Sequence, residues 1–283
     1  MRHAAAAVAV ALLCACHLYD PVDDIDYREF PDTRSAVSAI LAEAGDVRVY
    51  AVGEYHPTRA STARTSPLAR FTTEIIDLLA PHARHMVVET WLDPGCQDTS
   101  ELQSQVTQAT GHTNATTDDL GALVEAGTRL HVKTHGLPMS CIDHQTVFDD
   151  RGRVDFLRLL LLVTEKLGEM TRAVIDDRHA VIVYGGALHN DLYPRWPLEE
   201  LSYAQPLAQE LGGGVLELDL VVPEVVAPME LVRSESWFPL LGRAAPGRVL
   251  VWERGPMSYV IILPAQDLEA AKVALPLVAR GST

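Results

Sequence analysis

Two short runs of mostly β-branched residues, each followed at once by a glycine, constrain the fold of this chain more than any other feature. They cover residues 47–52 (VRVYAV) and 179–184 (HAVIVY), and their length and composition are typical of buried strands. A histidine stands three residues after a glycine in Gly53-Glu54-Tyr55-His56 and in Gly186-Ala187-Leu188-His189. Because a glycine directly after a strand indicates a tight turn, both imidazoles are expected just beyond the carboxyl end of a strand.

The residues after the first histidine motif predict a β-α-β unit. An apolar stripe at helical spacing runs through residues 67–79, and residues 85–90 (HMVVET) follow as a second strand. Units of this kind place their strands parallel, with the helix packed across them. Residues 248–253 and 258–263 flank a short turn and predict a C-terminal antiparallel hairpin at the sheet edge. The chain is therefore expected to have an α/β fold with a mainly parallel central sheet and flanking helices.

Further elements complete the predicted fold. Helices are expected at residues 35–44, 118–126, 154–175 and 198–211, and short strands at 129–133, 138–143 and 215–220. Gly45 and Gly127 follow the first two of these helices, where a C-cap belongs. The polar residues 93–117 are interpreted as a lid or an inserted flap.

Length and composition fit one domain with a substantial core. The chain has 283 residues, of which 48% are hydrophobic, so residues 34–283 are interpreted as a single α/β domain. Acidic residues outnumber basic ones by 38 to 23, which gives a net charge of −15 with neutral histidines. A protein that binds nucleic acid needs clustered Lys and Arg to neutralise phosphates, and this chain has no such cluster. Nucleic acid is therefore excluded as a partner, whereas the oligomeric state stays open.

The N-terminal residues 1–15 have the pattern of a secretory signal peptide, with a basic start and an apolar stretch too short to span a bilayer. The stretch ends in Leu13-Cys14-Ala15-Cys16, which resembles the lipobox of bacterial lipoproteins. That resemblance implies cleavage before Cys16, its modification by lipid such as palmitate, and attachment to a membrane of the bacterial cell envelope. Ordinary cleavage near Ala15 is the alternative, and both predict export. The acidic residues 16–33 are interpreted as a tether.

Export changes the interpretation of Cys96 and Cys141, because only oxidising compartments let a disulfide persist. The two cysteines are a candidate disulfide. Two buried free thiols are the alternative, since spacing in the sequence does not show whether the two Cα atoms approach within bridging distance.

Charged, amide and imidazole side chains gather where the predicted strands end. Because the carboxyl ends of parallel strands meet at one edge of a sheet, we expect several of these side chains to form one site. Each also has a structural alternative: His56 or His189 in a plain turn, Glu89 as a cap or a partner of Arg84, Asp143 and His144 as a solvated strand end. The residues are Glu54, His56, Glu89, Asp143, His144, His189 and Asn190.

The composition of this set suits a divalent metal. Two imidazoles and one or two carboxylates match the ligands that Zn²⁺ or Mn²⁺ takes while keeping a position open for water. We expect His56, His189 and Glu89 as ligands or water-orienting groups and Glu54 as the general base, with Glu54 and Glu89 as the catalytic carboxylates. The sequence contains no nucleophile-elbow, P-loop or dinucleotide-binding motif that would favour other enzyme classes.

These residues resemble the superfamily that includes the erythromycin esterases, the ChaN haem-uptake lipoproteins and the TraB/TIKI proteases. Its recurring pattern is a GExH turn after the first strand, a glutamate that ends the second strand and a late GxxH turn. Gly53, Glu54 and His56 match the first element, Glu89 the second, and Gly186 with His189 the third. The lipobox and the chain length are most similar to the ChaN-like branch.

The resemblance implies an α/β fold with its site at the strand ends, and three chemistries. The TIKI-like branch implies metal-dependent peptide hydrolysis, with Zn, Mn or Co as the metal. The esterase branch implies ester hydrolysis by water that a histidine and glutamates activate. The ChaN branch implies haem or iron binding, although residues 57–70 lack the further histidines of that branch. We therefore expect an exported, lipid-anchored metal-dependent hydrolase of a small molecule or peptide, with a haem- or iron-binding uptake lipoprotein as the alternative and an inactive scaffold as a third possibility.

Overall fold

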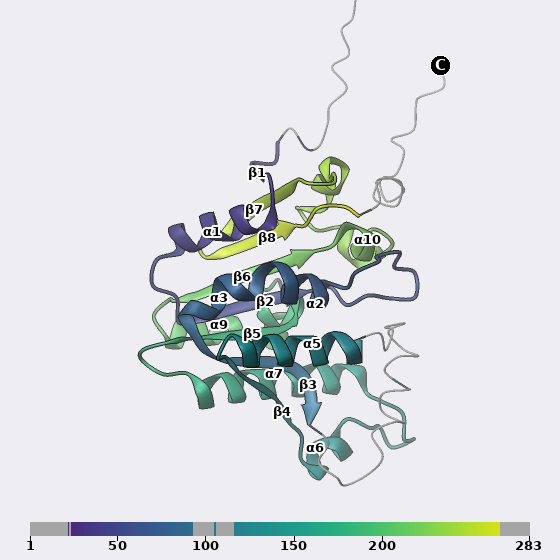
Figure 1. Ribbon diagram of the computed structural model, residues 1–283. Helices are drawn as coiled ribbons and strands as arrows, with labels where there is room; N and C mark the ends of the chain where they lie inside the picture. The colour runs from purple at the N-terminus through teal and green to yellow at the C-terminus, as the bar shows by residue number, and fades with distance from the viewer. Residues whose placement is uncertain (1–21, 23, 93–104, 106–115, 267–283) are drawn as a thin grey trace, which may run out of the picture.

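The core of the fold is an eight-stranded sheet in the order β1-β7-β8-β6-β2-β5-β3-β4, flanked by helices on both faces (Figure 1). The computed structural model describes residues 22, 24–92, 105 and 116–266. The five pairings from β8 through β6, β2, β5 and β3 to β4 are parallel, whereas β7 pairs antiparallel with both β8 and β1. The predicted α/β fold, with a mainly parallel sheet and a C-terminal antiparallel hairpin, is confirmed. The strands are β1 Arg28–Phe30, β2 Val49–Glu54, β3 Ala83–Leu92, β4 Lys133–Pro138, β5 Ala180–Gly186, β6 Val215–Val221, β7 Val249–Gly255 and β8 Ser258–Ile262.

The helices form two layers. Buried residues of α1, α2, α3 and α5 pack on one face of the sheet, and buried residues of α7 and α9 pack on the other. The α-helices are α1 Thr33–Ala44, α2 Pro67–Arg70, α3 Ile76–Leu79, α5 Thr116–Arg129, α6 Cys141–Thr146, α7 Phe156–Val174, α8 Ala187–Asn190, α9 Ala204–Glu210 and α10 Pro223–Val226. A π-helical turn, η1 Phe71–Ile75, joins α2 to α3, and 3-10 turns lie at η2 Ala80–His82, η3 Glu199–Leu201, η4 Glu230–Val232 and η5 Phe238–Arg243. Within the described residues, none of the helices is both long and apolar enough to cross a membrane.

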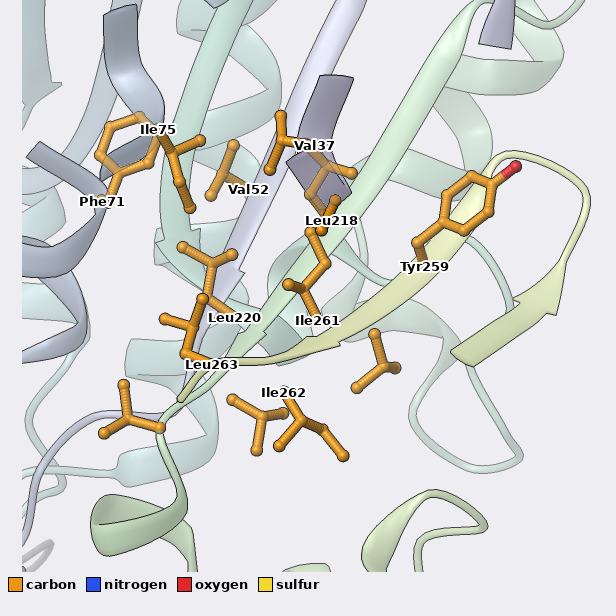
Figure 2. Packing of buried hydrophobic residues seen from close by; sticks show 14 of the residues in the cluster. Val37, Val52, Phe71, Ile75, Leu218, Leu220, Tyr259, Ile261, Ile262 and Leu263 are labelled. Atoms are coloured by element: carbon orange, nitrogen blue, oxygen red, sulfur yellow. The ribbon is translucent and has the colours of Figure 1, made fainter. Parts of the chain in front are cut away.

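The alternation of side chains along the central strands decides which face each site residue joins. On β2, Val52 packs in the α1 layer with Phe71 and Leu218 (Figure 2), whereas Ala51 packs in the α7 layer. Successive side chains of a strand point to opposite faces. The side chain of Glu54 therefore lies on the face of the sheet that α1 covers, and Gly53 lies on the face that α7 covers.

Two predicted boundaries around β4 are wrong. Helix α5 continues through Gly127 to Arg129, so the strand predicted at 129–133 begins only at Lys133. The glycine serves close packing rather than helix termination, because a Cβ at Gly127 would lie 2.9 Å from Oγ1 of Thr134. The chain leaves the helix at His131, whose φ is +59°.

The strand predicted at 138–143 is also wrong, because β4 ends at Pro138 and α6 begins after Ser140. The Oγ of Ser140 accepts a hydrogen bond from the Asp143 N–H at 3.1 Å, and the Asp143 carboxylate accepts one from the Ser140 N–H at 2.8 Å. This is a capping box, which starts a helix. Asp143 and His144 therefore lie on a helix and not at a strand end.

The remaining differences concern the ends of the domain and one helix. Residues 198–211, predicted as one helix, form η3 and α9 with a break between them. Within the predicted tether, Arg28–Phe30 pairs with β7, so the hairpin is not the sheet edge as predicted. The predicted signal peptide, Cys16, Cys96 and most of the predicted flap lie outside the described residues.

Candidate strand-end site

Four predicted side chains come together at the carboxyl ends of the central strands: Glu54, His56, Glu89 and His189. Glu54 is the last residue of β2 and pairs in register with Gly186 at the end of β5. Glu89 lies on β3, one residue beyond the pairing of Val88 with Tyr184. The parallel register of three strands thus brings Glu54 and His189, which are 135 positions apart in the sequence, to one edge of the sheet.

His56 is held by Glu54. Its Nδ1 lies 2.7 Å from Oε1 of Glu54, and its Nε2 lies 3.8 Å from Oε1 of Glu89. The imidazole is 34% exposed, whereas the side chain of Glu54 is only 5% exposed. Burial alone would lower the pKa of His56, but the hydrogen bond with Glu54 and the charges of Glu54 and Glu89 raise that pKa well above its usual value. His56 is therefore the accessible member of the set and favours a positive charge at this position.

Glu89 lies between the two histidines. Its Oε2 accepts a hydrogen bond from the Gly186 N–H at 2.6 Å, and its Oε1 lies 3.9 Å from Nε2 of His189. Burial alone would raise the pKa of Glu89, but the attraction of His189, the contacts with His56 and the Gly186 N–H lower it to about 2. Glu89 is therefore a carboxylate at neutral pH.

His189 is oriented from the α7 side. Its Nδ1 lies 2.8 Å from Oγ1 of Thr164 and 3.2 Å from the carbonyl oxygen of Leu201, and the residue is only 3% exposed. Because a carbonyl can only accept, we infer that Nδ1 carries the hydrogen and that Nε2 presents its lone pair towards Glu89. Burial lowers the pKa of His189, which favours the neutral imidazole.

Glycines make room for these groups. A Cβ at Gly185 would lie 2.7 Å from Oε2 of Glu89, and one at Gly186 would lie 3.2 Å from Nε2 of His56 and 3.5 Å from Cδ2 of His189. A Cβ at Gly53 would lie 2.2 Å from Oδ1 of Asp219 and 2.8 Å from Cα of Ala187. The glycines of both motifs are therefore required by close contacts.

Asn190 supports the site without reaching the histidines. Its Nδ2 donates to the carbonyl oxygen of Val52 at 3.0 Å, and its Oδ1 accepts a hydrogen bond from the Tyr203 hydroxyl at 2.6 Å. The residue is fully buried at 0% exposure. Asn190 thus ties α8, which carries His189, to the end of β2, which precedes His56.

The other predicted residues lie elsewhere. The side chain of Asp143 bonds within the capping box and lies 3.5 Å from Nζ of Lys166, and the buried His144 packs on Phe148. Cys141 is an exposed thiol at the start of α6. Because Cys96 lies outside the described residues, its pairing with Cys141 stays a prediction.

Two supporting residues were missed by sequence reasoning. The hydroxyl of Tyr184 donates to Oε2 of Glu54, and Thr164 contacts His189 from the middle of α7. Tyr184 lies within the strand run that leads to the second motif, but its place on the face of Glu54 follows from the register of β2 with β5. Thr164 gave only a weak signal, as one polar residue inside an apolar helical stripe.

The three groups are spaced slightly more widely than the donors around a small divalent ion. In a tetrahedral zinc site with bonds of about 2.0–2.3 Å, neighbouring donor atoms stand roughly 3.3–3.7 Å apart. Both Nε2 atoms approach the same Glu89 oxygen at 3.8 and 3.9 Å, which is slightly wider. In the part of the chain that the structure describes, no group of three or more His, Cys, Asp or Glu side chains already has the geometry of a metal site. Binding of an ion would therefore draw the three groups together.

A second group of charged residues lies beside the site, on the α7 side of β6. Arg254 contacts Asp191 at 2.5 Å, Glu217 at 3.4 Å and Asp219 at 3.5 Å. One guanidinium thus faces three carboxyl groups in a buried setting. Burial raises the pKa of Glu217 to about 7 against the attraction of Arg254, and burial together with Glu217 raises the pKa of Asp219 well above its usual value.

No model of a known protein family matches this chain, and no curated protein matches it. Among solved structures, that of the type III effector HopBA1 matches with a TM-score of 0.41 and 15% sequence identity, over 86% of this chain and 98% of that one. The function is therefore proposed from the geometry of the strand-end residues.

Proposed function

We propose that this protein is an exported hydrolase that binds one divalent metal ion through His56, His189 and Glu89 and cleaves an ester or peptide bond. The observation that carries the proposal is the approach of both Nε2 atoms to one Glu89 oxygen, at 3.8 and 3.9 Å. These separations are too long for hydrogen bonds, so the groups converge on a shared point without being bonded to each other.

The hydrogen bonds at the far side of each ring support the same proposal. Nδ1 of His56 bonds to Glu54, and Nδ1 of His189 bonds to Thr164 and the Leu201 carbonyl. Metal-binding histidines almost always have their second nitrogen fixed by a carboxylate, carbonyl or other acceptor, which sets the tautomer and the ring direction. Both histidines have this arrangement.

The ion, Glu89 and Glu54 have different roles in the proposed reaction. When bound, a divalent ion lowers the pKa of water and polarises a carbonyl group. Glu89 is ionised and faces the point where the rings meet, so it would hold the ion there together with the two imidazoles. Glu54 is buried, and both of its oxygens accept hydrogen bonds, so we assign it to orienting His56 rather than to the proton transfer expected from the sequence.

Metal binding by the purified chain tests the proposal directly. Titration calorimetry with Zn²⁺, Mn²⁺ and Co²⁺ after treatment with a chelator is expected to show one ion bound per chain. His56→Ala and His189→Ala are each expected to abolish binding and the hydrolysis of ester and peptide substrates. His179→Ala is the matched control, because His179 also lies beside a carboxylate, with its Nδ1 3.4 Å from Asp176, but outside the site. A chain that binds none of the three metals, with hydrolysis unaffected by His56→Ala, would refute the proposal.

Haem binding remains the alternative prediction. His189 is only 3% exposed, which leaves His56 as the histidine of the pair that an iron porphyrin could reach. Addition of haemin is expected to give no Soret shift that depends on His56. A Soret band lost in His56→Ala would replace the hydrolase proposal with haem uptake.

Export and lipid anchoring are proposed from the sequence. Cys16→Ser is expected to block incorporation of labelled palmitate and to release the protein from the membrane fraction. Unchanged labelling in Cys16→Ser would place the lipid at another residue, and a wild type that takes up no label would refute lipid anchoring.

A further inference from the structure

Tyr184 connects the strand-end site to the buried core of the α1 layer. It lies on β5, two residues before Gly186, and it is 3% exposed. Its ring packs on Phe71 with 4.7 Å between ring centroids. Its hydroxyl donates to Oε2 of Glu54, the residue that holds His56. A chain of contacts therefore runs from the core to the accessible histidine.

Glu54 is fixed from both sides. Its Oε2 accepts from Tyr184, and its Oε1 lies 2.7 Å from Nδ1 of His56. A carboxylate that accepts one hydrogen bond on each oxygen cannot turn about its terminal bond without breaking one of them. Without Tyr184, one buried oxygen of Glu54 would lose a donor in a place where only 5% of the side chain is exposed.

The phenol is suited to donate at this position. A hydroxyl buried among apolar side chains is costly unless it is hydrogen-bonded, and Glu54 is the acceptor that the structure gives it. Burial, together with the charge of Glu54, raises the pKa of Tyr184 well above its usual value, so the hydroxyl keeps its proton.

We propose that Tyr184 is a positioning residue, whose hydroxyl anchors Glu54 so that Glu54 keeps the hydrogen of His56 on Nδ1 and directs Nε2 towards Glu89. The hydroxyl of Tyr184 donates to Glu54, and Glu54 bonds to His56. Tyr184 therefore acts on His56 through Glu54. The orientation of His56 stands on the geometry alone, whereas its value for metal affinity rests on the proposed function.

The first test detects the hydrogen on Nδ1 of His56 by NMR and needs no metal. In the full chain labelled with ¹⁵N-histidine, His56 is expected to show a downfield, hydrogen-bonded Nδ1–H resonance. Tyr184→Phe retains the ring that packs on Phe71 and is expected to broaden that signal or move it upfield. Tyr50→Phe is the matched control, because Tyr50 lies on β2 on the same face as Glu54, is 4% exposed and makes its ring contact with His82. An unchanged Nδ1–H signal in folded Tyr184→Phe would overturn the proposal.

A second variant covers the case in which Tyr184→Phe does not fold. Glu54→Gln in the otherwise unchanged chain leaves one acceptor oxygen where Glu54 has two, so at least one of the two bonds must be lost. The Nδ1–H signal of His56, the exchange protection of the Tyr184 hydroxyl, or both are expected to weaken. Retention of both signals at wild-type strength would overturn the proposal, because neither bond would then depend on the carboxylate. Where all variants fold, Tyr184→Phe with Glu54→Gln is expected to be no worse than Glu54→Gln alone.

Metal titration separates this proposal from the proposed function. If the wild-type chain binds Zn²⁺, Tyr184→Phe is expected to weaken the affinity by roughly 10- to 100-fold, and Tyr50→Phe to leave it unchanged. Equal affinities in wild type and Tyr184→Phe would overturn the positioning role. If the wild type binds no metal, the proposed function fails, and the Nδ1–H signal alone decides the role of Tyr184.

Discussion

The backbone N–H of Gly186 donates to Oε2 of Glu89 at 2.6 Å, and this bond joins the end of β5 to β3 beside Nε2 of His56. The glycine therefore has two roles: its N–H holds the carboxylate, and its missing side chain leaves room for the imidazoles. The backbone at Gly186 has φ −61° and ψ 139°, which any residue adopts. A substitution of Gly186 therefore tests only whether the site has room for a side chain, because it causes no backbone strain.

Gly186→Ala is expected to damage the site while leaving the fold intact. The added methyl would lie 3.2 Å from Nε2 of His56 and 3.5 Å from Oε2 of Glu89, so the ring must move away from the carboxylate. A misplacement of about 1 Å can cost about 100-fold in rate. The ring here must move by a few tenths of an ångström, so kcat/KM and metal affinity are both expected to fall by less than that. Gly121→Ala in α5 is the control, because a Cβ there meets nothing within 4 Å. Full activity of Gly186→Ala would show that His56 does not act at this position.

Thr164→Val is expected to loosen His189. The substitution keeps the shape of the side chain but removes the oxygen 2.8 Å from Nδ1 of His189, at a cost of about 1 kcal/mol in the free energy of unfolding. Metal affinity should fall by roughly 10-fold or more. Thr171→Val is the control on the same helix, because the hydroxyl of Thr171 donates to the Leu167 carbonyl at 2.7 Å within α7. Calorimetric titration of both variants with metal measures the two affinities. Equal affinities would contradict the role of Thr164.

Glu217→Gln is expected to change how stability depends on pH. The pKa of Glu217 is raised to about 7 by burial, from 4.5, so the folded chain retains a proton that the unfolded chain releases. This contribution to stability is fully present below pH 4.5 and is lost as the pH rises through 7. The charged groups that face Glu217 are Arg254, Asp191 and Asp219, and the Leu192 N–H donates to its carboxylate at 3.1 Å.

Urea unfolding between pH 4.5 and 7 measures this effect. The free energy of unfolding of the wild type is expected to fall relative to that of Glu217→Gln by about 3 kcal/mol over the range set by the two pKa values. Glu210→Gln, which alters an exposed partner of Arg172, should run parallel to the wild type. A parallel course for Glu217→Gln as well would show that Glu217 is ionised in the folded protein at pH 5.

Glu89→Gln is expected to act in the opposite pH range. The pKa of Glu89 is lowered to about 2 in the folded protein from 4.5, so its contribution to stability is present above pH 4.5 and is lost as the pH falls through 2. In chelator, the wild type should exceed Glu89→Gln in unfolding free energy by about 3 kcal/mol at pH 6. The difference should narrow as the pH falls towards 2, and a constant difference would indicate that packing rather than charge explains it.

The strand-end placement of Glu54, His56, Glu89 and His189 was predictable, because β-branched runs and glycines carry a strong local signal of strand and turn. Asp143 was misplaced because an apolar pair before it looks like the end of a strand, whereas the capping box with Ser140 starts a helix. That motif was legible in the sequence, since a serine precedes a carboxylate by three residues.

The contacts of Tyr184 and Thr164 were not predictable in the same way. Tyr184 meets Glu54 only because β2 and β5 pair in the register of Glu54 with Gly186, across 130 residues of sequence. Thr164 meets His189 because α7 packs on the side of the sheet where α8 begins. Both relationships depend on tertiary packing, which hydrophobic periodicity along one segment does not encode.

Glu54 and Glu89 approach the histidines from opposite faces of the sheet, Glu54 beside Tyr184 in the α1 layer and Glu89 beside Gly185 and Leu167 in the α7 layer. Local unfolding of either helical layer would therefore expose one of the two carboxylates to water. A partly folded form that has lost one layer would keep only one of the two carboxylates in its buried setting. The full geometry of the site thus requires both layers to be packed on the sheet.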